Sequence, residues 1–402
     1  MSSNIRVIKY GGSSLATADH IRFVAQQIIE RKRPGEHLVI VASAMGDATD
    51  QLMSLAGEVS SDPPLRELDK ILGTGEHVST ALLCMALRRL GHEAVSLTGP
   101  QGGIRTSDEH FNASVEDVDD RRIRKELADG RIVVVAGFQG QNTAGEITTL
   151  GRGGSDTTAV VLADALAARR CEICSDVDGV YSADPRVVKD ARRLDSISYV
   201  EMLEMARHGA SVLDSRAVHH ARGTGVEIYA RSTFEPDAPG TLISELSTDE
   251  PRVVGIASHE ALLSLAIDAA ADRAAANAIL EEVEPDDVFL DKTDAGTGRR
   301  NILIPSNRLA DERSFTAGLH EEFEHQVVVG SPCSSVSAIG LGVGSDEDLQ
   351  ETSRRFSARV GVSPSDDFSG EHSITCLVQP DQAALLMNAF HREFDCPTED
   401  AA

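Results

Sequence analysis

The fold of this chain is decided by the stretch between Thr148 and Thr158, which reads TTLGRGGSDTT. It combines three glycines with an arginine and an aspartate, and an apolar run over residues 159–166 follows directly. Glycines let backbone N–H groups approach an anion closely, and a helix N-terminus adds a positive dipole end. Arginine can bind a carboxylate or a phosphate, and aspartate can hold a metal ion or a proton. The stretch therefore predicts an anion-binding loop at the start of a helix.

A second loop of the same chemistry opens the chain, where residues 5–15 read IRVIKYGGSSL. Its β-branched beginning suits a buried strand, and an apolar pattern with helical spacing follows it. Strand, glycine turn and helix in this order place ligands at the carboxyl edge of a parallel sheet. Lys9 precedes Gly11 and Gly12, so we expect it to project from the strand end toward the bound group. The sequence does not match the GxxxxGK[ST] pattern of a Walker A loop.

Length and charge limit the class of protein. The 402 residues predict two or three domains, and a hydrophobic content of 41% is typical of globular proteins. The formal net charge of −26 argues against nucleic acid as a partner, because phosphate backbones are bound by basic patches. No apolar run approaches the roughly 18 residues that span a membrane, and the N-terminus has no signal pattern. We therefore expect a cytoplasmic enzyme that does not contact membranes.

Strand and helix patterns alternate along about the first 245 residues. This alternation predicts an α/β fold with a mostly parallel sheet sandwiched by helices. Helical stretches are expected at 65–90 and 112–127, among others. Strands are expected at 5–8, 38–42, 94–97, 132–136, 171–175 and 226–230.

A turn-rich segment at 234–241 and a polar linker at 245–251 end this part of the chain. We therefore expect two domains, at residues 1–246 and 251–402. The second domain shows two similar sets of short strands and helices, which predict a pair of small α+β modules without chemistry of their own. The sets comprise 253–257, 262–267, a helix at 269–282 and 301–304, and then 334–341, a helix at 346–355, 373–378 and 383–390.

Further polar groups follow other predicted strands. Small hydroxyl side chains, Ser43 and Thr49 among them, come after the strand at 38–42. Glu76 interrupts an apolar helical run, where a carboxylate is unfavourable unless it meets a cation such as an amino group. A solvated helix face explains Glu76 equally well at this stage. The loop at 175–186 offers an aromatic ring, carboxylates and an arginine, which suit the base, ribose and phosphates of a nucleotide.

Two other patterns are interpreted as structural. Cys171 and Cys174 form a CxxC motif, but side chains three apart on a strand face opposite sides and cannot easily share a metal. His219 and His220 are adjacent instead of four residues apart, so we expect no metal-ligand role for them. The six scattered cysteines predict no disulfide framework.

Together the motifs resemble those of the aspartate kinases, which belong to the amino acid kinase family. The matches follow the family's order and cover about residues 5–245. The region after residue 250 resembles, far more weakly, the paired ACT modules that follow the kinase domain in this family. The matching segments are KYGGSS at 9–14, SAMGDATD at 43–50, GEHVS at 75–79, TTLGRGGSD at 148–156 and SDVDGVYSADPR at 175–186.

The resemblance implies transfer of the γ-phosphoryl group of ATP to the β-carboxylate of L-aspartate, with Mg²⁺ bridging the nucleotide phosphates. Such a transfer depends on positioning and charge neutralisation instead of a covalent nucleophile. By resemblance, Lys9 stabilises charge on the transferring oxygens, assisted by the amides of Gly11 and Gly12 and by Ser13. Asp156 organises that lysine.

The resemblance also assigns the two ligand sites. Arg152 is expected to bind the substrate α-carboxylate and Glu76 the ammonium group. The remaining assigned residues are Ser43, Thr49, Gly153, Gly154 and Ser155 around the amino acid, and Gly11, Gly12, Ser13, Ser175, Asp176, Tyr181, Asp184 and Arg186 around ATP.

The chain departs from the family pattern at several positions. In the GAKVLH motif that follows the nucleotide loop, the lysine is replaced by Ser211 and the histidine by Asp214. Loss of a positive charge beside a polyphosphate predicts weaker stabilisation of the transition state. Ala48 replaces a family threonine, and residues 266–272 lack the glycine expected after the first strand of the ACT-like region. We therefore do not expect feedback inhibition by lysine or threonine.

Three hypotheses about function stay open at this point. The first is a working aspartate kinase, and the second is a kinase for the carboxylate of another amino acid. The third is a non-catalytic nucleotide-binding paralogue that lost turnover through Ser211. Intact Lys9 and Asp156 argue against the third hypothesis, because a decayed kinase would lose them as readily. A homodimer or larger homo-oligomer is expected, since ACT modules generally pair and small sheets have edges that tend to be covered.

Overall fold

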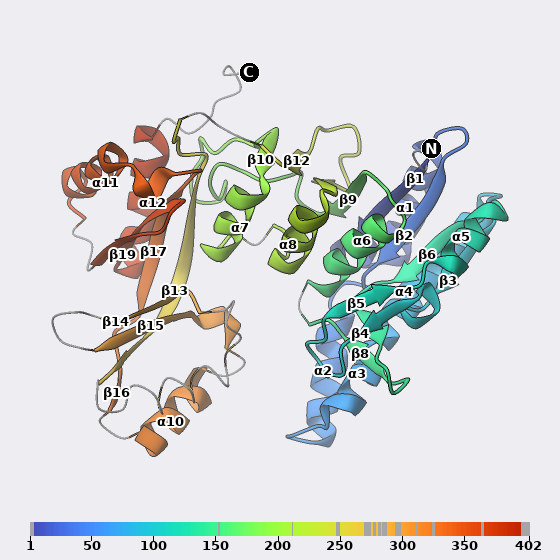
Figure 1. The fold of residues 1–402 in the computed structure, drawn as a ribbon, viewed down its shortest axis with the longest axis horizontal. Coiled ribbons are helices and arrows are strands. Elements are labelled where there is room, and N and C mark those ends of the chain that lie inside the picture. Colours follow the sequence, from blue (N-terminus) through green and yellow to red (C-terminus); the bar gives the residue numbers. More distant parts are fainter. Residues whose placement is uncertain are drawn as a thin grey trace. The chain divides into compact units, whose positions relative to one another are not determined.

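The chain forms two compact units (Figure 1). A computed structural model describes residues 4–151, 153–210, 212–246, 250–268, 275, 279, 283, 288–293, 299–309, 312–323, 326–362 and 366–394. The first unit comprises Met1–Val180, Arg193–Met202 and Val212–Ser247, and the second comprises Tyr181–Arg192, Leu203–Ser211 and Thr248–Ala402. The second unit therefore takes in two stretches that precede the linker. The domain division at residues 246–251 stays a prediction.

An eight-stranded sheet forms the centre of the first unit, and all six strands predicted from the sequence belong to it. The strand order is β10-β12-β11-β9-β1-β2-β6-β3. The β11–β12 pair is antiparallel and the other pairs are parallel, which confirms the predicted α/β fold. The strands are β1 (Ile5–Tyr10), β2 (His37–Ala42), β3 (Ala94–Leu97), β6 (Ile132–Ala136), β9 (Arg170–Ser175), β10 (Ser196–Ser198), β11 (Glu227–Ser232) and β12 (Thr241–Ser244).

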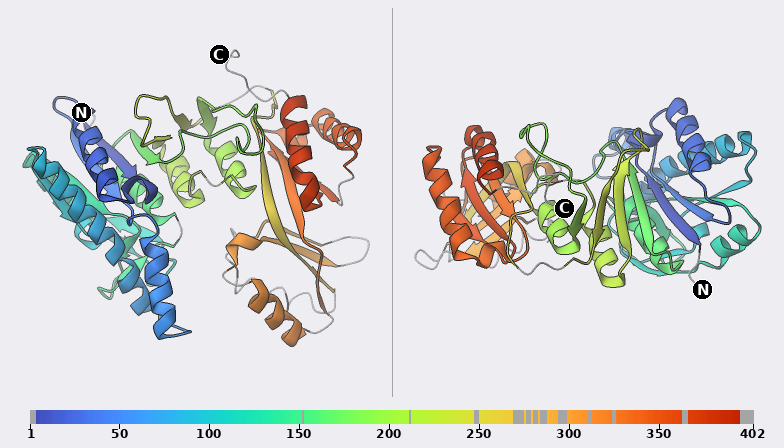
Figure 2. Two further views of the ribbon diagram at one scale, coloured as in Figure 1. Left: turned by 180° about the vertical axis from the view of Figure 1, so that it is seen from behind. Right: turned by 90° about the horizontal axis from the view of Figure 1, so that it is seen from above.

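Helices cover both faces of this sheet (Figure 2). On one face α1 and α4 bury their apolar sides against Ile8, Tyr10 and their neighbours on β2 and β6. On the other face α6 packs against β1, β2 and β9. Because side chains alternate along a strand, Lys9 points to the α6 side. The helices of this unit include α1 (Ala18–Glu30), α2 (Ala48–Val59), α3 (Leu65–Leu72), α4 (Thr74–Arg89), α5 (Arg121–Ala128), α6 (Gly154–Ala165) and α8 (Ser215–Thr224).

A separate four-stranded sheet in the first unit was not anticipated from the sequence. It runs β5-β4-β7-β8, from β4 (Ile104–Thr106), β5 (Val115–Val118), β7 (Gln139–Gln141) and β8 (Ile147–Thr149). The helix predicted at 112–127 is therefore wrong over its first half. Residues 115–118 pair antiparallel with β4, so sheet formation overrides the local helical pattern there, and α5 begins only at Arg121.

The helical run predicted at 65–90 is interrupted at Gly73, which ends α3 and precedes α4. The N–H of Gly73 donates to the carbonyl of Asp69 at 3.0 Å, and Gln139 Nε2 donates to the Gly73 carbonyl at 2.8 Å. The side chain from β7 thus satisfies a helix-end carbonyl that would otherwise lack a partner. Because of this break, α4 has its own N-terminus, and Glu76 lies in its first turn.

One seven-stranded sheet forms the second unit, instead of two separate module sheets. Strand β13 (Gly255–Ile267) joins its halves, because its first part pairs with β17 and its second part with β15 and β16. The strands predicted at 253–257 and 262–267 are therefore parts of one strand with a register shift between His259 and Leu262. The predicted helix at 269–282 falls almost entirely outside the described residues. The other elements include β14 (Leu290–Thr293), β15 (Arg300–Pro305), α10 (Glu312–Phe323), β16 (Val327–Val329), β17 (Cys333–Ile339), α11 (Glu347–Arg359), β18 (Asp366–Ser369), β19 (Ser373–Val378) and α12 (Ala383–Glu393).

The two early stretches of the second unit are held by specific contacts. Ser182 Oγ lies 2.8 Å from Nε2 of His391 on α12, and His208 Nδ1 lies 2.7 Å from Ser337 Oγ on β17. Gly209 has a φ of +110°, and a Cβ added there would lie 2.1 Å from the backbone oxygen of Ser258. None of the helices in the described part of the chain is long and apolar enough to cross a membrane.

We expect Gly209→Ala to lower the free energy of unfolding by roughly 2 kcal/mol or more, because it adds backbone strain and a clash with a main-chain atom. The matched control is Gly318→Ala in the middle of α10, where an added Cβ meets nothing within 4 Å. The control is expected to stabilise by about 0.5–1 kcal/mol. Urea unfolding of the full chain measures both, and equal midpoints for the two variants would contradict the prediction.

Candidate active site

Lys9 and Asp156 form a buried ion pair between the end of β1 and the first turn of α6. Lys9 Nζ lies 2.6 Å from Asp156 Oδ1, and the two residues are 9% and 8% exposed. Asp156 Oδ1 has no further hydrogen-bond partner. A buried charge that loses its partner is strongly destabilising, so the pair fixes the lysine at the carboxyl edge of the sheet.

The glycine loop after Lys9 approaches the loop after β2 very closely. A Cβ added to Gly12 would lie 3.0 Å from the carbonyl oxygens of both Ala44 and Gly46. The Gly46 N–H donates to the Gly12 carbonyl at 3.0 Å. At Gly11 an added Cβ would lie 3.6 Å from Lys9 Nζ, so the ammonium group lies over this glycine.

One predicted phosphate donor must be corrected. The N–H of Gly11 donates to the carbonyl of Cys174 at 3.0 Å and extends the β1–β9 pairing. That N–H is already used, so it is not a donor to a nucleotide. The Gly12 N–H and the Ser13 hydroxyl remain candidates for that role.

Glu76 lies in the first turn of α4 and is 2% exposed. Its Oε1 accepts from the Ala44 N–H at 3.1 Å, whereas Oε2 has no hydrogen-bond partner. Gly75 permits this approach, since a Cβ there would lie 2.9 Å from Ala44 Cβ. Burial raises the pKa of Glu76 to about 8, and the Ala44 N–H opposes that shift. A buried carboxyl with one unpaired oxygen is a site prepared for a cation.

The other two predicted residues near β2 are positioned by the same loop. The Ser43 N–H donates to the carbonyl of Tyr10 at 3.1 Å, which places Ser43 beside the end of β1. Thr49 lies in the first turn of α2 and is partly buried. Both residues therefore follow β2 at the edge where Lys9 lies.

The loop between β8 and α6 depends on its glycines. Gly153 has a φ of +69°, and a Cβ added there would lie 2.1 Å from Asp214 Oδ2. At Gly154 an added Cβ would lie 2.7 Å from Leu150 Cβ. Ser155 is 7% exposed in the first turn of α6. Arg152 lies outside the described residues.

Asp214 caps helix α8. Its carboxylate accepts from the backbone N–H groups of Arg216 and Ala217 and from Thr157 Oγ1 at 3.2 Å. Burial raises the pKa of Asp214, Arg216 lowers it and the negative charge of Asp156 raises it further. A second carboxylate therefore lies close to Asp156. Ser211 lies outside the described residues.

The nucleotide residues predicted from the first unit lie beside the glycine loop. Ser13 Oγ donates to Asp176 Oδ1 at 3.2 Å, which joins the loop after β1 to the loop after β9. Ser175 ends β9, and its hydroxyl accepts from the Val177 N–H at 3.3 Å.

Tyr181, Asp184 and Arg186 belong to the second unit. The Asp184 carboxylate accepts from Arg186 Nε at 3.0 Å and from Arg186 Nη2 at 2.6 Å. This bidentate pair lowers the pKa of Asp184. Arg186 is thus already held by a neighbouring carboxylate.

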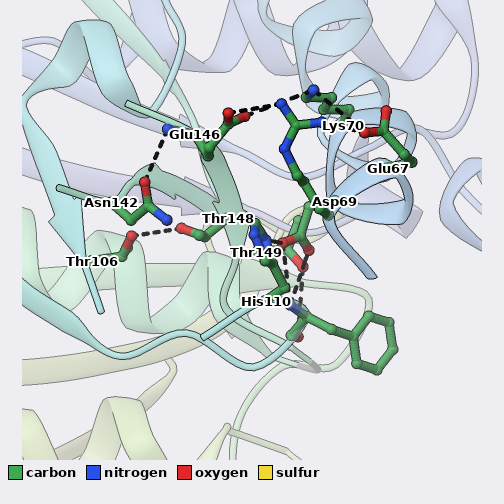
Figure 3. Close-up of polar contacts among 11 residues, drawn as sticks. Glu67, Asp69, Lys70, Thr106, His110, Asn142, Glu146, Thr148 and Thr149 are labelled. Carbon is green, nitrogen blue, oxygen red and sulfur yellow. Dashed lines mark hydrogen bonds and ion pairs between the residues drawn. The ribbon is translucent and has the colours of Figure 1, made fainter. Parts of the chain in front are cut away.

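A further buried carboxylate, Asp69, was missed by the sequence analysis. It is fully buried on α3 and accepts from Thr149 Oγ1 at 2.5 Å, while His110 Nδ1 lies 2.6 Å from it (Figure 3). The sequence contains a signal for its burial, because Asp69 lies on the same face of α3 as the buried residues Leu68 and Leu72. A carboxylate on such an apolar face requires partners from elsewhere in the fold.

In the described part of the chain, no group of three or more His, Cys, Asp or Glu residues is arranged to hold a metal ion. Cys171 and Cys174 are buried free thiols on β9, and burial raises the pKa of both.

Comparison with known proteins gives concordant results. The profile of the amino acid kinase family matches residues 4–232. The chain is 38% identical to the aspartokinase of Corynebacterium glutamicum over 413 residues, covering 98% of this chain and 97% of the relative. It is 39% identical to the aspartokinase of Mycobacterium tuberculosis over 414 residues, with the same coverage of 98% and 97%. Escherichia coli aspartokinase III, solved with aspartate and ADP, shares the fold with a TM-score of 0.80 at 23% identity, covering 96% of this chain and 99% of that one.

The raised pKa of Glu76 predicts a specific dependence of stability on pH. Because its folded-state pKa of about 8 exceeds the ordinary value of 4.5, its contribution is fully present below pH 4.5 and is lost as pH rises through 8. Between pH 5 and 9 the ligand-free protein should therefore lose about 4 kcal/mol of unfolding free energy relative to Glu76→Gln. Urea midpoints at pH 5, 7 and 9 measure this, with Glu67→Gln, exposed on α3, as control. Parallel pH profiles for wild type and Glu76→Gln would contradict the prediction.

Proposed function

Because the chain belongs to the aspartokinase branch of the amino acid kinase family, we infer that it phosphorylates L-aspartate at its side-chain carboxylate. ATP supplies the γ-phosphoryl group, and the products are 4-phospho-L-aspartate and ADP. The observation that carries this function is the unpaired buried oxygen of Glu76, which is connected to the Lys9–Asp156 pair through the loops that follow β1 and β2.

A continuous set of contacts links these charged groups. Glu76 accepts a hydrogen bond from the Ala44 N–H, and the Ala44 carbonyl lies close to Gly12. The preceding residue, Gly11, lies next to Lys9 Nζ. The buried carboxyl group of Glu76 and the buried ammonium group of Lys9 are thus connected through the loops that follow β1 and β2. An α-amino acid places its ammonium group and its side-chain carboxylate at opposite ends, which suits an anion for the first and a cation for the second.

The transfer step needs no general base. A β-carboxylate has an ordinary pKa near 3.9 and is ionised at neutral pH. One of its oxygens attacks the γ-phosphorus, the bond from that phosphorus to the β,γ-bridging oxygen breaks, and ADP leaves with the electron pair. Lys9 neutralises charge that develops on the transferring group, and Asp156 holds the lysine in place.

Two further groups complete the proposed acceptor site. Arg152 is proposed to bind the α-carboxylate as a planar bidentate donor. The loop with Gly153, Gly154 and Ser155 supports it at the N-terminus of α6, where the helix dipole favours an anion. Ser43 and Thr49 are proposed to line the same pocket.

For the nucleotide we propose Gly12, Ser13, Ser175 and Asp176 in the first unit. The predictions for Tyr181, Asp184 and Arg186 concern residues of the second unit, where Asp184 orients the guanidinium of Arg186. Mg²⁺ bound to the ATP phosphates supplies positive charge that offsets the polyphosphate. The protein is further proposed to work in the cytoplasm as a homodimer or larger homo-oligomer, without nucleic acid or membrane partners. The sheet edges at β14 and β18 support the oligomer.

The assay is ATP- and Mg²⁺-dependent acyl phosphate formation from L-aspartate, trapped with hydroxylamine. Lys9→Ala should lower kcat by about 10²–10³-fold, because it removes a preorganised charge at the transferring group. Lys292→Ala, at an exposed position on β14, is the control and should retain activity. Low and high salt are both needed, since the acidic surface responds to screening.

Absence of turnover in a wild-type protein that binds ATP would contradict the aspartate assignment. A panel of other amino acids then tests a kinase for a different carboxylate, and failure of the whole panel would indicate a nucleotide-binding paralogue.

Binding of L-aspartate should release close to one proton at pH 7. Glu76 has a pKa of about 8 in the free protein and must ionise to pair with the substrate ammonium group. Calorimetric titrations in buffers with different ionisation enthalpies measure the proton count. Glu76→Gln should bind more weakly and release none, and an unchanged proton count in that variant would exclude Glu76 as the source.

A further inference from the structure

We propose that Asp69 is a positioning residue for the amino acid substrate. Its carboxylate holds α3, the helix that leads to Glu76, against β8, the strand that leads to the 150–156 loop. This inference rests on the proposed function and adds a residue that contacts neither reactant. Asp69 acts through the segments that its carboxylate joins.

The carboxylate of Asp69 binds groups from two other parts of the first unit. Thr149 Oγ1 on β8 donates at 2.5 Å. The Phe111 N–H donates at 3.1 and 3.2 Å to the two oxygens, and His110 Nδ1 lies 2.6 Å from Oδ2. Figure 3 shows His110 and Thr149 converging on Asp69. Asp69 is 0% exposed, so its carboxylate makes no hydrogen bond to solvent and is stabilised only by these partners.

On the helix side, Asp69 lies one turn before the break that orients Glu76. Its backbone carbonyl accepts from the Gly73 N–H at 3.0 Å, and Glu76 follows in the first turn of α4. Gln139 Oε1 lies 2.8 Å from His77 Nε2, beside Glu76 in the chain. A shift of α3 would therefore move the N-terminus of α4 and the carboxylate it presents.

On the strand side, Thr149 immediately precedes the glycine-rich loop. Its carbonyl accepts from the Ala113 N–H at 2.9 Å, so the 110–113 segment runs alongside it. Phe111 has a φ of +71°, which is unfavourable for a residue with a side chain. A Cβ added at Gly151 would lie 2.8 Å from Asn112 Oδ1, so this segment also borders the loop itself. The hydrogen bond from the Phe111 N–H to Asp69 stabilises that strained position.

The ion pairs between α3 and the β7–β8 hairpin are peripheral. Glu146 pairs with Arg66 at 2.7 Å and with Lys70 at 3.7 Å, as Figure 3 shows for Lys70. These side chains are 30–45% exposed, and exposed ion pairs contribute little. The buried carboxylate of Asp69 thus holds the two segments together more strongly than these ion pairs do, and the Gln139–Gly73 hydrogen bond acts beside it.

The test compares two buried threonines of the same small sheet. Thr149→Val removes the hydroxyl that binds Asp69, while Thr106→Val removes the 2.5 Å hydrogen bond between Thr106 and Thr148. Both side chains are at most 1% exposed, and valine keeps their shape. We expect similar falls in Tm, but only Thr149→Val should raise KM for L-aspartate, by about tenfold or more. The KM for ATP should change less than twofold, and Thr149→Ser should restore the wild-type KM for L-aspartate.

A second measurement does not depend on the acceptor. Hydrogen exchange of residues 108–113 should become faster in Thr149→Val and in Asp69→Asn, and stay unchanged in Thr106→Val. If wild type fails to phosphorylate L-aspartate, this readout alone still decides the positioning role. Equal KM values for the two valine variants in an active enzyme, or equal exchange of residues 108–113 in both, would overturn the proposal.

Discussion

The ion pair between Lys9 and Asp156 is the interaction on which the rest of this site depends. Neither charge is stable alone in a position that is about nine-tenths buried, so the end of β1 and the first turn of α6 must meet. That meeting requires close backbone approach on both sides. Gly12 allows the loop after β1 to contact the loop after β2. Gly153 allows the loop between β8 and α6 to pack its backbone against the carboxylate of Asp214. These glycines are therefore needed for the close packing around the ion pair as much as for binding a phosphate.

Three buried carboxylates of the first unit have different numbers of partners, and the difference separates their roles. Asp156 faces a cation and serves to hold it. Asp69 accepts bonds from a hydroxyl, a backbone N–H and a ring nitrogen, so it is satisfied without any ligand. Glu76 has one backbone donor and an oxygen with no partner, and burial raises its pKa. The surroundings thus decide whether a buried carboxyl group is paired with a cation, fully hydrogen-bonded within the protein or left with an unpaired oxygen.

Six of the eight strands of the large sheet could be predicted because each contains a short apolar run, whereas β10, β12 and the elements defined by distant partners could not. Residues 115–118 form β5 because β4 lies beside them, and nothing in their own pattern indicates a strand. The break at Gly73 depends on a side chain from β7. Gly11 matched a phosphate-loop pattern, yet its N–H is used by the carbonyl of Cys174. In each case the deciding group is far away in sequence.

The sequence by itself determined which residue types carry the chemistry, because lysine, aspartate, arginine and glycine in family order leave few alternatives. It also determined the parallel α/β sheet, since hydrophobic periodicity is a local property. Only the tertiary structure decided that the Lys9–Asp156 pair is buried, that Glu76 retains an unpaired oxygen and that Asp69 joins three segments. Burial and hydrogen-bond satisfaction are properties of the whole packed fold, and they decide whether a carboxylate is neutral, paired or available to a substrate.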